Sequence, residues 1–229
     1  MKLADIIETF ISGDWGEETV AEDTPNSVFC IRGADIVPIT NHCFNGIPQR
    51  FVCDKTIENK TLKAGDLIIE KSGGSPTQST GRIVYVSEDL IKAKGNVVCS
   101  NFCTAFRVKT GWNSLYVYYY WQNVYNHGAF FNFEGKTTGI KNLQLDNALS
   151  AIDIEYLPLE KQNQIVASLA SIDEKIKVNR QINDNLRASR VQSQTQFELC
   201  RGAAVNADIS PNLPWPGHSS AMAKVRHAA

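Results

Sequence analysis

The sequence predicts a mixed α/β globular domain of the α+β class, followed by a long α-helix that forms a coiled coil. Between residues 28 and 108, short runs rich in Val, Ile, Phe and Tyr are bounded by turn residues, as in the strands of a mixed or antiparallel sheet. Between residues 158 and 200 the pattern changes. Glycine is absent from 159 to 200, and apolar residues recur at alternating spacings of four and three, which is a heptad pattern.

The elements of the first part follow from these patterns in chain order. Helical spacing predicts a short helix over residues 3–11, before an acidic stretch rich in turn residues. The apolar runs predict strands over residues 28–32, 46–54, 66–71, 81–87 and 96–108. Residues 71–82 (KSGGSPTQSTGR) are nearly all small and polar, which predicts a loop.

The middle of the chain contains one ambiguous segment, residues 114–126 (SLYVYYYWQNVYN). Its density of Tyr and Val favours a strand, whereas several of its apolar positions would share a helical face. We favour a helix packed on the sheet, so that the aromatic run at 116–121 belongs to the core and is not a base-stacking platform. The composition of residues 132–145 predicts a second polar loop, and that of residues 152–157 predicts a last strand. Pro158 then opens the final helix.

The C-terminal helix is predicted to be an oligomerisation element. Its seam positions are Ile165, Leu169, Ile172, Ile176, Asn179, Asn183 and Leu186. At ~1.5 Å per residue, a helix of roughly 40 residues is about 60 Å long, and its apolar stripe requires a partner. An Asn in the seam can fix the register and orientation of that partner. The alternative is a helix docked on its own sheet. Residues 201–229 predict an irregular tail.

Composition limits the classes of function. With 43% apolar residues and a net charge of −1 over 229 residues, the chain is neither disordered nor strongly basic. The charge is uneven, however. Residues 27–110 hold eleven basic and seven acidic side chains, and residues 157–229 hold nine and six. An anionic partner is therefore favoured at these two parts of the chain.

Motifs for catalysis, metals and export are missing from the sequence. The six cysteines include no C-x-x-C pair, and the four histidines are scattered, so no metal site is expected. No P-loop, G-x-G-x-x-G or G-x-S-x-G motif is present, so we expect neither catalytic residues nor a cofactor. The sequence shows no secretory signal and no transmembrane segment, which together with unpaired thiols predicts a cytoplasmic protein with six buried cysteines.

Several segments, in this order, resemble the specificity subunit of type I restriction–modification enzymes. They are residues 3–6 (LADI), 13–16 (GDWG), 30–36 (CIRGADI), 63–69 (KAGDLII), 71–76 (KSGGSP), 80–82 (TGR), 137–143 (TTGIKNL) and 158–165 (PLEKQNQI). The heptad positions then continue the resemblance through Leu186. It covers residue 3 to about residue 200 and leaves out the tail.

The resemblance implies a target recognition domain over residues 1–157, a spacer and dimerisation helix over 158–200, and a tail at 201–229. A full specificity subunit has two recognition domains and two helices, whereas this chain has one of each. It is therefore expected to be a half-subunit, acting as a homodimer or beside a second half. The resemblance also implies double-stranded DNA as the ligand, with a bipartite target. The methyltransferase (M) and restriction (R) subunits are the implied partners, and catalysis belongs to them.

The two polar loops are the candidate DNA contacts. Hydroxyl groups, Lys and Arg contact phosphates, while Arg, Gln and Asn read base edges. The candidates are Lys71, Ser72, Ser75, Thr77, Gln78, Ser79, Thr80 and Arg82 in the first loop, and Lys136, Thr137, Thr138, Lys141 and Asn142 in the second. The alternative is that both loops are plain solvated connections.

Two other functions stay open at this point. The chain can be a dimerisation or assembly remnant that no longer reads DNA. It can also be an enzyme whose loops close over a small phosphorylated ligand, which would require a pocket with perturbed titratable groups.

Overall fold

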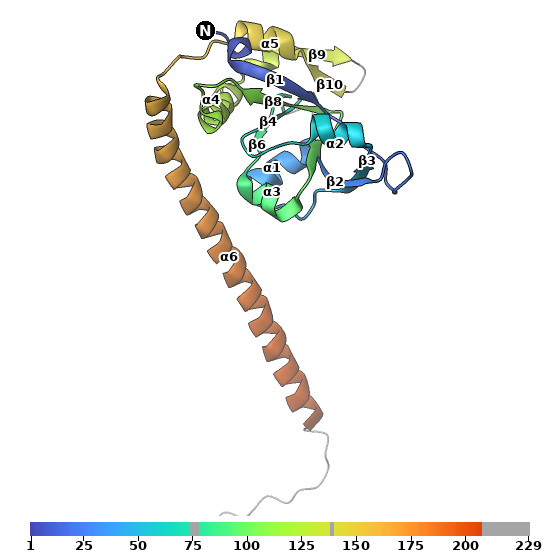
Figure 1. Cartoon of the computed structure of the whole chain (residues 1–229). Helices are drawn as coiled ribbons and strands as arrows, with labels where there is room; N and C mark the ends of the chain where they lie inside the picture. Colours follow the sequence, from blue (N-terminus) through green and yellow to red (C-terminus); the bar gives the residue numbers. More distant parts are fainter. Residues whose placement is uncertain (74–77, 138–139, 208–229) are drawn as a thin grey trace, which may run out of the picture. The chain divides into compact units, whose positions relative to one another are not determined.

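The computed structural model describes residues 1–73, 78–137 and 140–207, and it consists of two units, Met1–Lys177 and Val178–Ala229. The first unit is a mixed α/β domain that includes the first turns of a long helix, α6 (Leu159–Ala207), and the second unit contains the rest of that helix (Figure 1). The predicted fold class, a mixed domain followed by a long helix, is confirmed. Among the described residues, no helix is long and apolar enough to cross a membrane.

A four-stranded antiparallel sheet forms the centre of the domain. Its strands, in spatial order, are β1 (Ile7–Ser12), β8 (Cys103–Val108), β4 (Leu67–Glu70) and β6 (Ile83–Tyr85). All four residues of β4 are buried, because hydrophobic clusters cover both faces of the sheet. Ile68 points into one cluster, while Leu67 and Ile69 belong to the other. Burial on both faces explains why the first three residues of this strand form an uninterrupted apolar run in the sequence.

Two smaller sheets flank the central one. One contains β3 (Gln49–Val52), β2 (Asn26–Ile31) and β7 (Val97–Cys99), with β2 antiparallel to β3 and parallel to β7. The other contains β5 (Ser72–Gly73), β10 (Ile140–Leu143) and β9 (Glu134–Thr137), all antiparallel. The second of these small sheets is built from the segments that the sequence predicted to be polar loops.

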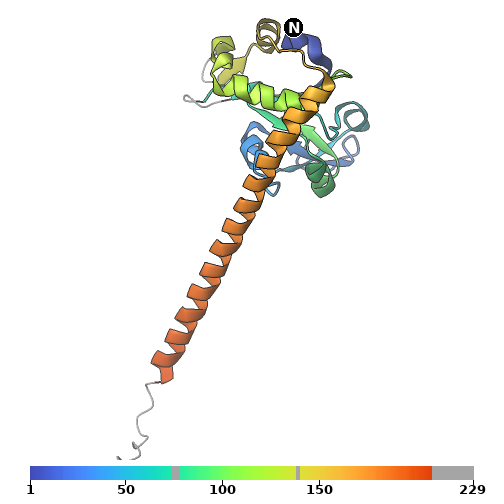
Figure 2. The same cartoon turned by 90° about the vertical axis from the view of Figure 1, so that its left-hand side faces the viewer.

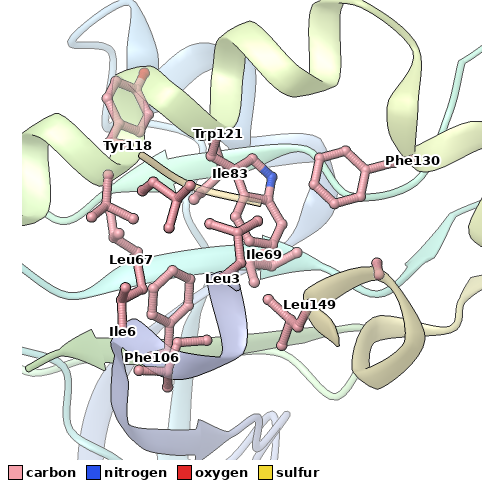
Figure 3. Close-up of a cluster of buried hydrophobic side chains, with 14 of the residues drawn as sticks. Leu3, Ile6, Leu67, Ile69, Ile83, Phe106, Tyr118, Trp121, Phe130 and Leu149 are labelled. Carbon is pink, nitrogen blue, oxygen red and sulfur yellow. The ribbon is translucent and has the colours of Figure 1, made fainter. Parts of the chain in front are cut away.

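The helix α4 (Ser114–Asn126) covers one face of the central sheet, as predicted for the ambiguous aromatic segment. The Asn113 side chain accepts hydrogen bonds from the backbone N–H groups of Leu115 and Tyr116 and caps the helix. Trp121 is fully buried and stacks on Phe130 with ring centroids 4.7 Å apart (Figure 3). The aromatic run is therefore mostly core, as expected.

Short helices complete the domain and were not predicted. They are α1 (Ile36–Thr40), α2 (Asp54–Lys60), α3 (Glu88–Lys94) and α5 (Leu145–Ala151), with 3₁₀ turns at Leu3–Ile6, Gly33–Asp35 and Ala129–Phe133. Helices of five to seven residues are not stable alone. They form because tertiary packing holds them and, in α3, because the Ser87 side chain caps the helix. No long periodic pattern in the sequence predicts them.

Four sequence-based assignments were wrong. Residues 3–11 form a 3₁₀ turn and then β1, because residues 7–12 pair with β8, a partner about 100 residues away. Residues 96–108 are two strands separated by a tight turn. The loop predicted at 132–145 is mostly the β9–β10 hairpin. Residues 152–157 are not a strand, and only one isolated bridge joins Asp153 to Lys2.

The helix α6 begins after Pro158, whose carbonyl oxygen accepts hydrogen bonds from the N–H groups of Lys161 and Gln162. It continues to Ala207, so the first seven residues of the predicted irregular tail are helical. Residues 208–229 lie outside the described residues.

The cysteines are only partly buried, which corrects the expectation that all of them lie in the core. Cys30, Cys99 and Cys103 are buried, whereas Cys43 is exposed and Cys53 is half-buried; the side chain of Cys200 lies outside those that the structure describes. Burial raises the pKa of Cys30 to about 12 and that of Cys103 to about 11. Those two thiols are protonated at neutral pH and act as small apolar side chains.

Candidate nucleic-acid interface

The structure brings the two predicted polar loops together in one sheet. In the β5–β10 pair, Ser72 lies opposite Asn142 and Gly73 lies opposite Lys141. The Ser72 hydroxyl donates to Oδ1 of Asn142 at 2.5 Å, and the Leu143 N–H donates to the Lys71 carbonyl at 2.7 Å. Segments about 70 residues apart in sequence therefore lie side by side in one small sheet.

A buried carboxylate, Glu134, holds the second loop onto the first. Its side chain is 2% exposed. Its Oε1 accepts hydrogen bonds from the backbone N–H of Thr80 at 2.7 Å and from the Thr80 hydroxyl at 3.2 Å. Its Oε2 lies 3.2 Å from Nζ of Lys141, which also donates to the Gln78 carbonyl at 3.3 Å. One side chain thus fixes positions in both predicted loops.

A second buried carboxylate, Glu70, fixes the end of the first loop. Arg82 binds it through two parallel hydrogen bonds, Nε to Oε2 at 2.7 Å and Nη2 to Oε1 at 2.5 Å. These bonds raise the pKa of the Arg82 guanidinium, although its burial acts in the opposite direction. The Trp121 indole N–H donates to the Gly81 carbonyl at 2.8 Å, and the Tyr125 hydroxyl donates to the Ser79 carbonyl at 2.8 Å. The loop is therefore anchored on the α4 side.

These contacts correct two of the candidate DNA contacts. The Thr80 residue is 1% exposed and its hydroxyl is bonded inside the protein, so it cannot reach DNA as placed. The Arg82 guanidinium is occupied by Glu70. Both residues act as supports of the loop. The sequence could not distinguish these two residues from DNA-contact residues. Glu134, the partner of Thr80, is distant in the sequence, and nothing in the sequence distinguishes Glu70, the partner of Arg82, from a solvated surface charge.

The other candidates are exposed or half-buried, lie in strand β9, or fall outside the described residues. Gln78 and Asn142 are exposed, and Lys71, Ser72, Ser79 and Lys141 are half-buried. Lys136 and Thr137 lie in strand β9. Ser75, Thr77 and Thr138 lie outside the described residues.

Glu70 and Glu134 are the residues of this region that sequence reasoning missed. The only signal was weak, namely an acidic side chain in or beside each of two otherwise basic and polar segments. In the described part of the chain, no group of His, Cys, Asp and Glu side chains is arranged to hold a metal ion.

The first turns of α6 contact the domain through one face. Gln162 is fully buried, its Oε1 accepts from the Asn113 N–H at 2.8 Å and its Nε2 donates to the Leu157 carbonyl at 2.8 Å. About three turns further along the same side, Asp173 accepts a hydrogen bond at 2.6 Å from the Tyr119 hydroxyl of α4. Figure 2 shows α4 beside the first turns of α6. Burial and the Asp173 carboxylate both raise the pKa of Tyr119. These contacts hold the beginning of the helix firmly.

The predicted seam borders that contact face, and its first two positions, Ile165 and Leu169, line a hollow together with residues of α4. Ile165, Ile172 and Ile176 are 37%, 52% and 41% exposed, although they are large apolar side chains. Leu186, in the second unit, is 62% exposed. Among the remaining seam positions, Leu169 is half-buried and Asn179 and Asn183 are exposed. A row of exposed Ile and Leu on one helix is unusual for a monomer and indicates a binding surface.

One protein-family model matches the sequence of this chain. The model of the type I restriction modification DNA specificity domain matches residues 53–188. A search of the curated proteins found no match.

Three solved structures resemble the fold at low sequence identity. A chain from a study of the complex assembly and conformational transition of the type I R-M system has 18% identity and a TM-score of 0.49. The S subunit of a type I restriction-modification system from M. genitalium has 11% sequence identity and a TM-score of 0.49. The HsdS subunit from Thermoanaerobacter tengcongensis has 16% sequence identity and a TM-score of 0.45. The matches cover 88%, 77% and 78% of this chain but only 42%, 39% and 38% of those chains. The chain thus spans less than half the length of each.

Proposed function

The chain belongs to the family of type I restriction modification DNA specificity domains, and we propose that it is a non-catalytic half-subunit that recognises double-stranded DNA. In this proposal, residues 1–157 form the recognition domain, and residues 158–200 belong to the helix that serves for dimerisation and as a spacer. The protein acts in the cytoplasm, where it directs M and R subunits to a bipartite target.

The observation that carries the proposal is the joining of the two polar loops in the β5–β10–β9 sheet. Polar groups of both loops are held together there. The Ser72 hydroxyl donates to Asn142, and Lys141, the ionic partner of Glu134, donates to the Gln78 carbonyl. A fixed array of donors and acceptors is what base reading requires, because hydrogen bonds to base edges depend on geometry.

Charge pairing within the domain argues that this chain does not bind DNA tightly alone. Arg32 is paired with Asp35, Arg82 with Glu70 and Arg107 with Asp66, each through two hydrogen bonds. Arginines engaged in this way contribute little to neutralising phosphates, and phosphate neutralisation supplies most non-specific affinity. Partner subunits therefore supply much of the binding energy.

The exposed seam of α6 supports a homodimer. Two copies that pair through Ile165, Ile172, Ile176 and Leu186 would bury side chains that are 37–62% exposed in one chain. If the helices are antiparallel, the two recognition domains lie near opposite ends of the pair. The dimer then reads two half-sites separated by a gap that the helices set, as in other two-fold DNA-binding proteins.

One experiment tests the function directly. The chain is combined with a cognate M subunit in a host that lacks other specificity proteins, and the modified adenines are mapped by sequencing. We expect methylation at one interrupted sequence only. Methylation that is absent although the complex assembles would favour an assembly remnant, and a complex that does not assemble would contradict the proposal.

A further inference from the structure

A cavity of about 390 Å³ lies beside the candidate DNA-contact surface. It is lined by two aromatic side chains, Trp15 and Phe102, by small residues, and by polar groups of Ser72 and Asn101. Cavities of roughly 300–1,000 Å³ with a mostly apolar lining and a few polar groups are typical of sites for small organic ligands. Ser72 belongs to β5, so the cavity opens next to the loop proposed to contact DNA.

The walls of this cavity are held rigidly. The turn between β7 and β8 carries Phe102, whose carbonyl accepts hydrogen bonds from the N–H groups of Lys71 at 2.8 Å and Ser72 at 3.1 Å. On the floor, a Cβ at Gly33 would lie 2.4 Å from Oε1 of Glu70, so only glycine fits there. The Arg50 guanidinium lies 3.9 Å from the centre of the Trp15 ring and fixes its plane.

The chemistry of the walls selects an uncharged, flat ligand. Arg32 is bound through Nε and Nη2 to Asp35, and Glu70 is bound by Arg82. Both charged residues of the wall are thus neutralised within the protein, which disfavours a phosphate. Aromatic faces stack on planar rings, and the hydroxyl and amide groups at the rim can bond the edge of such a ring.

We propose that this cavity receives one nucleobase of the target DNA, turned out of the duplex. Phe102 is 55% exposed at the rim, where a base leaving the stack would meet it. The base exchanges stacking in the duplex for stacking in the cavity, with its edge against Ser72 and Asn101. This inference rests on the proposed DNA-binding function and adds a specificity-determining site to it.

The test uses the whole chain in complex with its M subunit and the DNA target found by methylation mapping. Each base pair of the target and its gap is replaced in turn by a mismatch. A base that must leave the stack does so more easily when it is mismatched, so we expect binding about tenfold tighter at one position in each half-site. The methylated adenine, which methyltransferases also turn out, serves as an internal reference.

Two variants assign the tightened position to the cavity. Phe102→Ala removes the aromatic rim and Ala34→Phe fills the space, and both positions are at the surface of the domain. Each variant should abolish the mismatch gain in the half-sites and leave the gain at the methylated adenine unchanged. Phe131→Ala, an equally exposed aromatic outside the cavity, should preserve both gains.

Three results would overturn the inference. If no mismatch outside the methylated adenine tightens binding, no base enters the cavity, while intact binding and methylation would leave the proposed function standing. If the gain persists in both variants, the base is received elsewhere. If the complex does not bind the matched target at all, the DNA-binding function and this inference fail together.

Discussion

Replacing Glu134 with alanine tests whether a buried carboxylate joins the two loops of the candidate interface. The substitution removes the acceptor of the Thr80 N–H and hydroxyl and the ionic partner of Lys141. Because Thr80 is 1% exposed, water does not readily replace the lost acceptor.

The expected cost follows from those contacts. A buried amide without a partner destabilises a protein by about 1–3 kcal/mol. The Lys141 side chain is 17% exposed and keeps its bond to the Gln78 carbonyl, so loss of the ion pair adds only about 0.5–1 kcal/mol. We expect the free energy of unfolding to fall by roughly 2–4 kcal/mol, which lowers the melting temperature by about 5–15 °C in a domain of this size.

Urea and thermal unfolding of three variants measure the effect. Glu134→Gln keeps a carbonyl oxygen for the Thr80 N–H and removes the charge, so it should lose only about 1 kcal/mol. Glu155→Ala removes an exposed carboxylate and should change stability by less than about 0.5 kcal/mol. An alanine variant as stable as the wild type, or a glutamine variant as unstable as the alanine variant, would refute the reasoning.

The remaining predictions concern the dimer, the DNA contacts and acid stability. Ile172→Glu with Ile176→Glu should give a monomer by light scattering, whereas Lys175→Glu outside the seam should not; a dimeric double variant would contradict the proposed interface. Lys71→Ala should weaken DNA binding and reduce the slope of its salt dependence by roughly one unit if the side chain contacts a phosphate; an unchanged slope would exclude that contact. A homodimer requires an interrupted palindrome as its target, because a two-fold axis places identical surfaces on both half-sites; methylation of two unrelated half-sites would show a different second half-subunit. Burial raises the pKa of Asp14, but hydrogen bonds from Thr56 and Lys60 outweigh this effect and lower the pKa below 3.8. The stability that this carboxylate contributes is therefore present above about pH 4 and is lost as the pH falls through the lowered pKa. In urea unfolding, the Asp14→Asn variant should therefore lose less stability than the wild type between about pH 6 and pH 2.

Parts of the fold were predictable because a local pattern had the same cause as the final structure. Residues 67–69 of β4 are apolar because both faces of the sheet are covered there, and the segment was predicted to be a strand. The aromatic segment of α4 became a helix with buried Trp121, as its spacing suggested. In α6, the absence of glycine and the regular spacing of apolar residues predicted a long helix.

Other elements depend on partners that lie far away in the sequence. Residues 3–11 have helical spacing, yet residues 7–12 pair with β8 in an antiparallel ladder that is interrupted only by a register shift between Ile7 and Thr9. The second polar loop looks irregular, but Lys141 and Asn142 pair with both β5 and β9. Tertiary pairing overrides weak local preference in both cases.

The candidate interface shows the same division at the level of single residues. The sequence by itself determined that two polar loops and one heptad helix exist, because composition and spacing are local properties. Only the tertiary structure decided that Thr80 and Arg82 are supports and that Gln78 and Asn142 stay at the surface. Only the fold brought Trp15 and Phe102 to one cavity. The physical reason is that burial and hydrogen-bond pairing are set by groups 12 to 87 residues apart, and no local pattern encodes those distances.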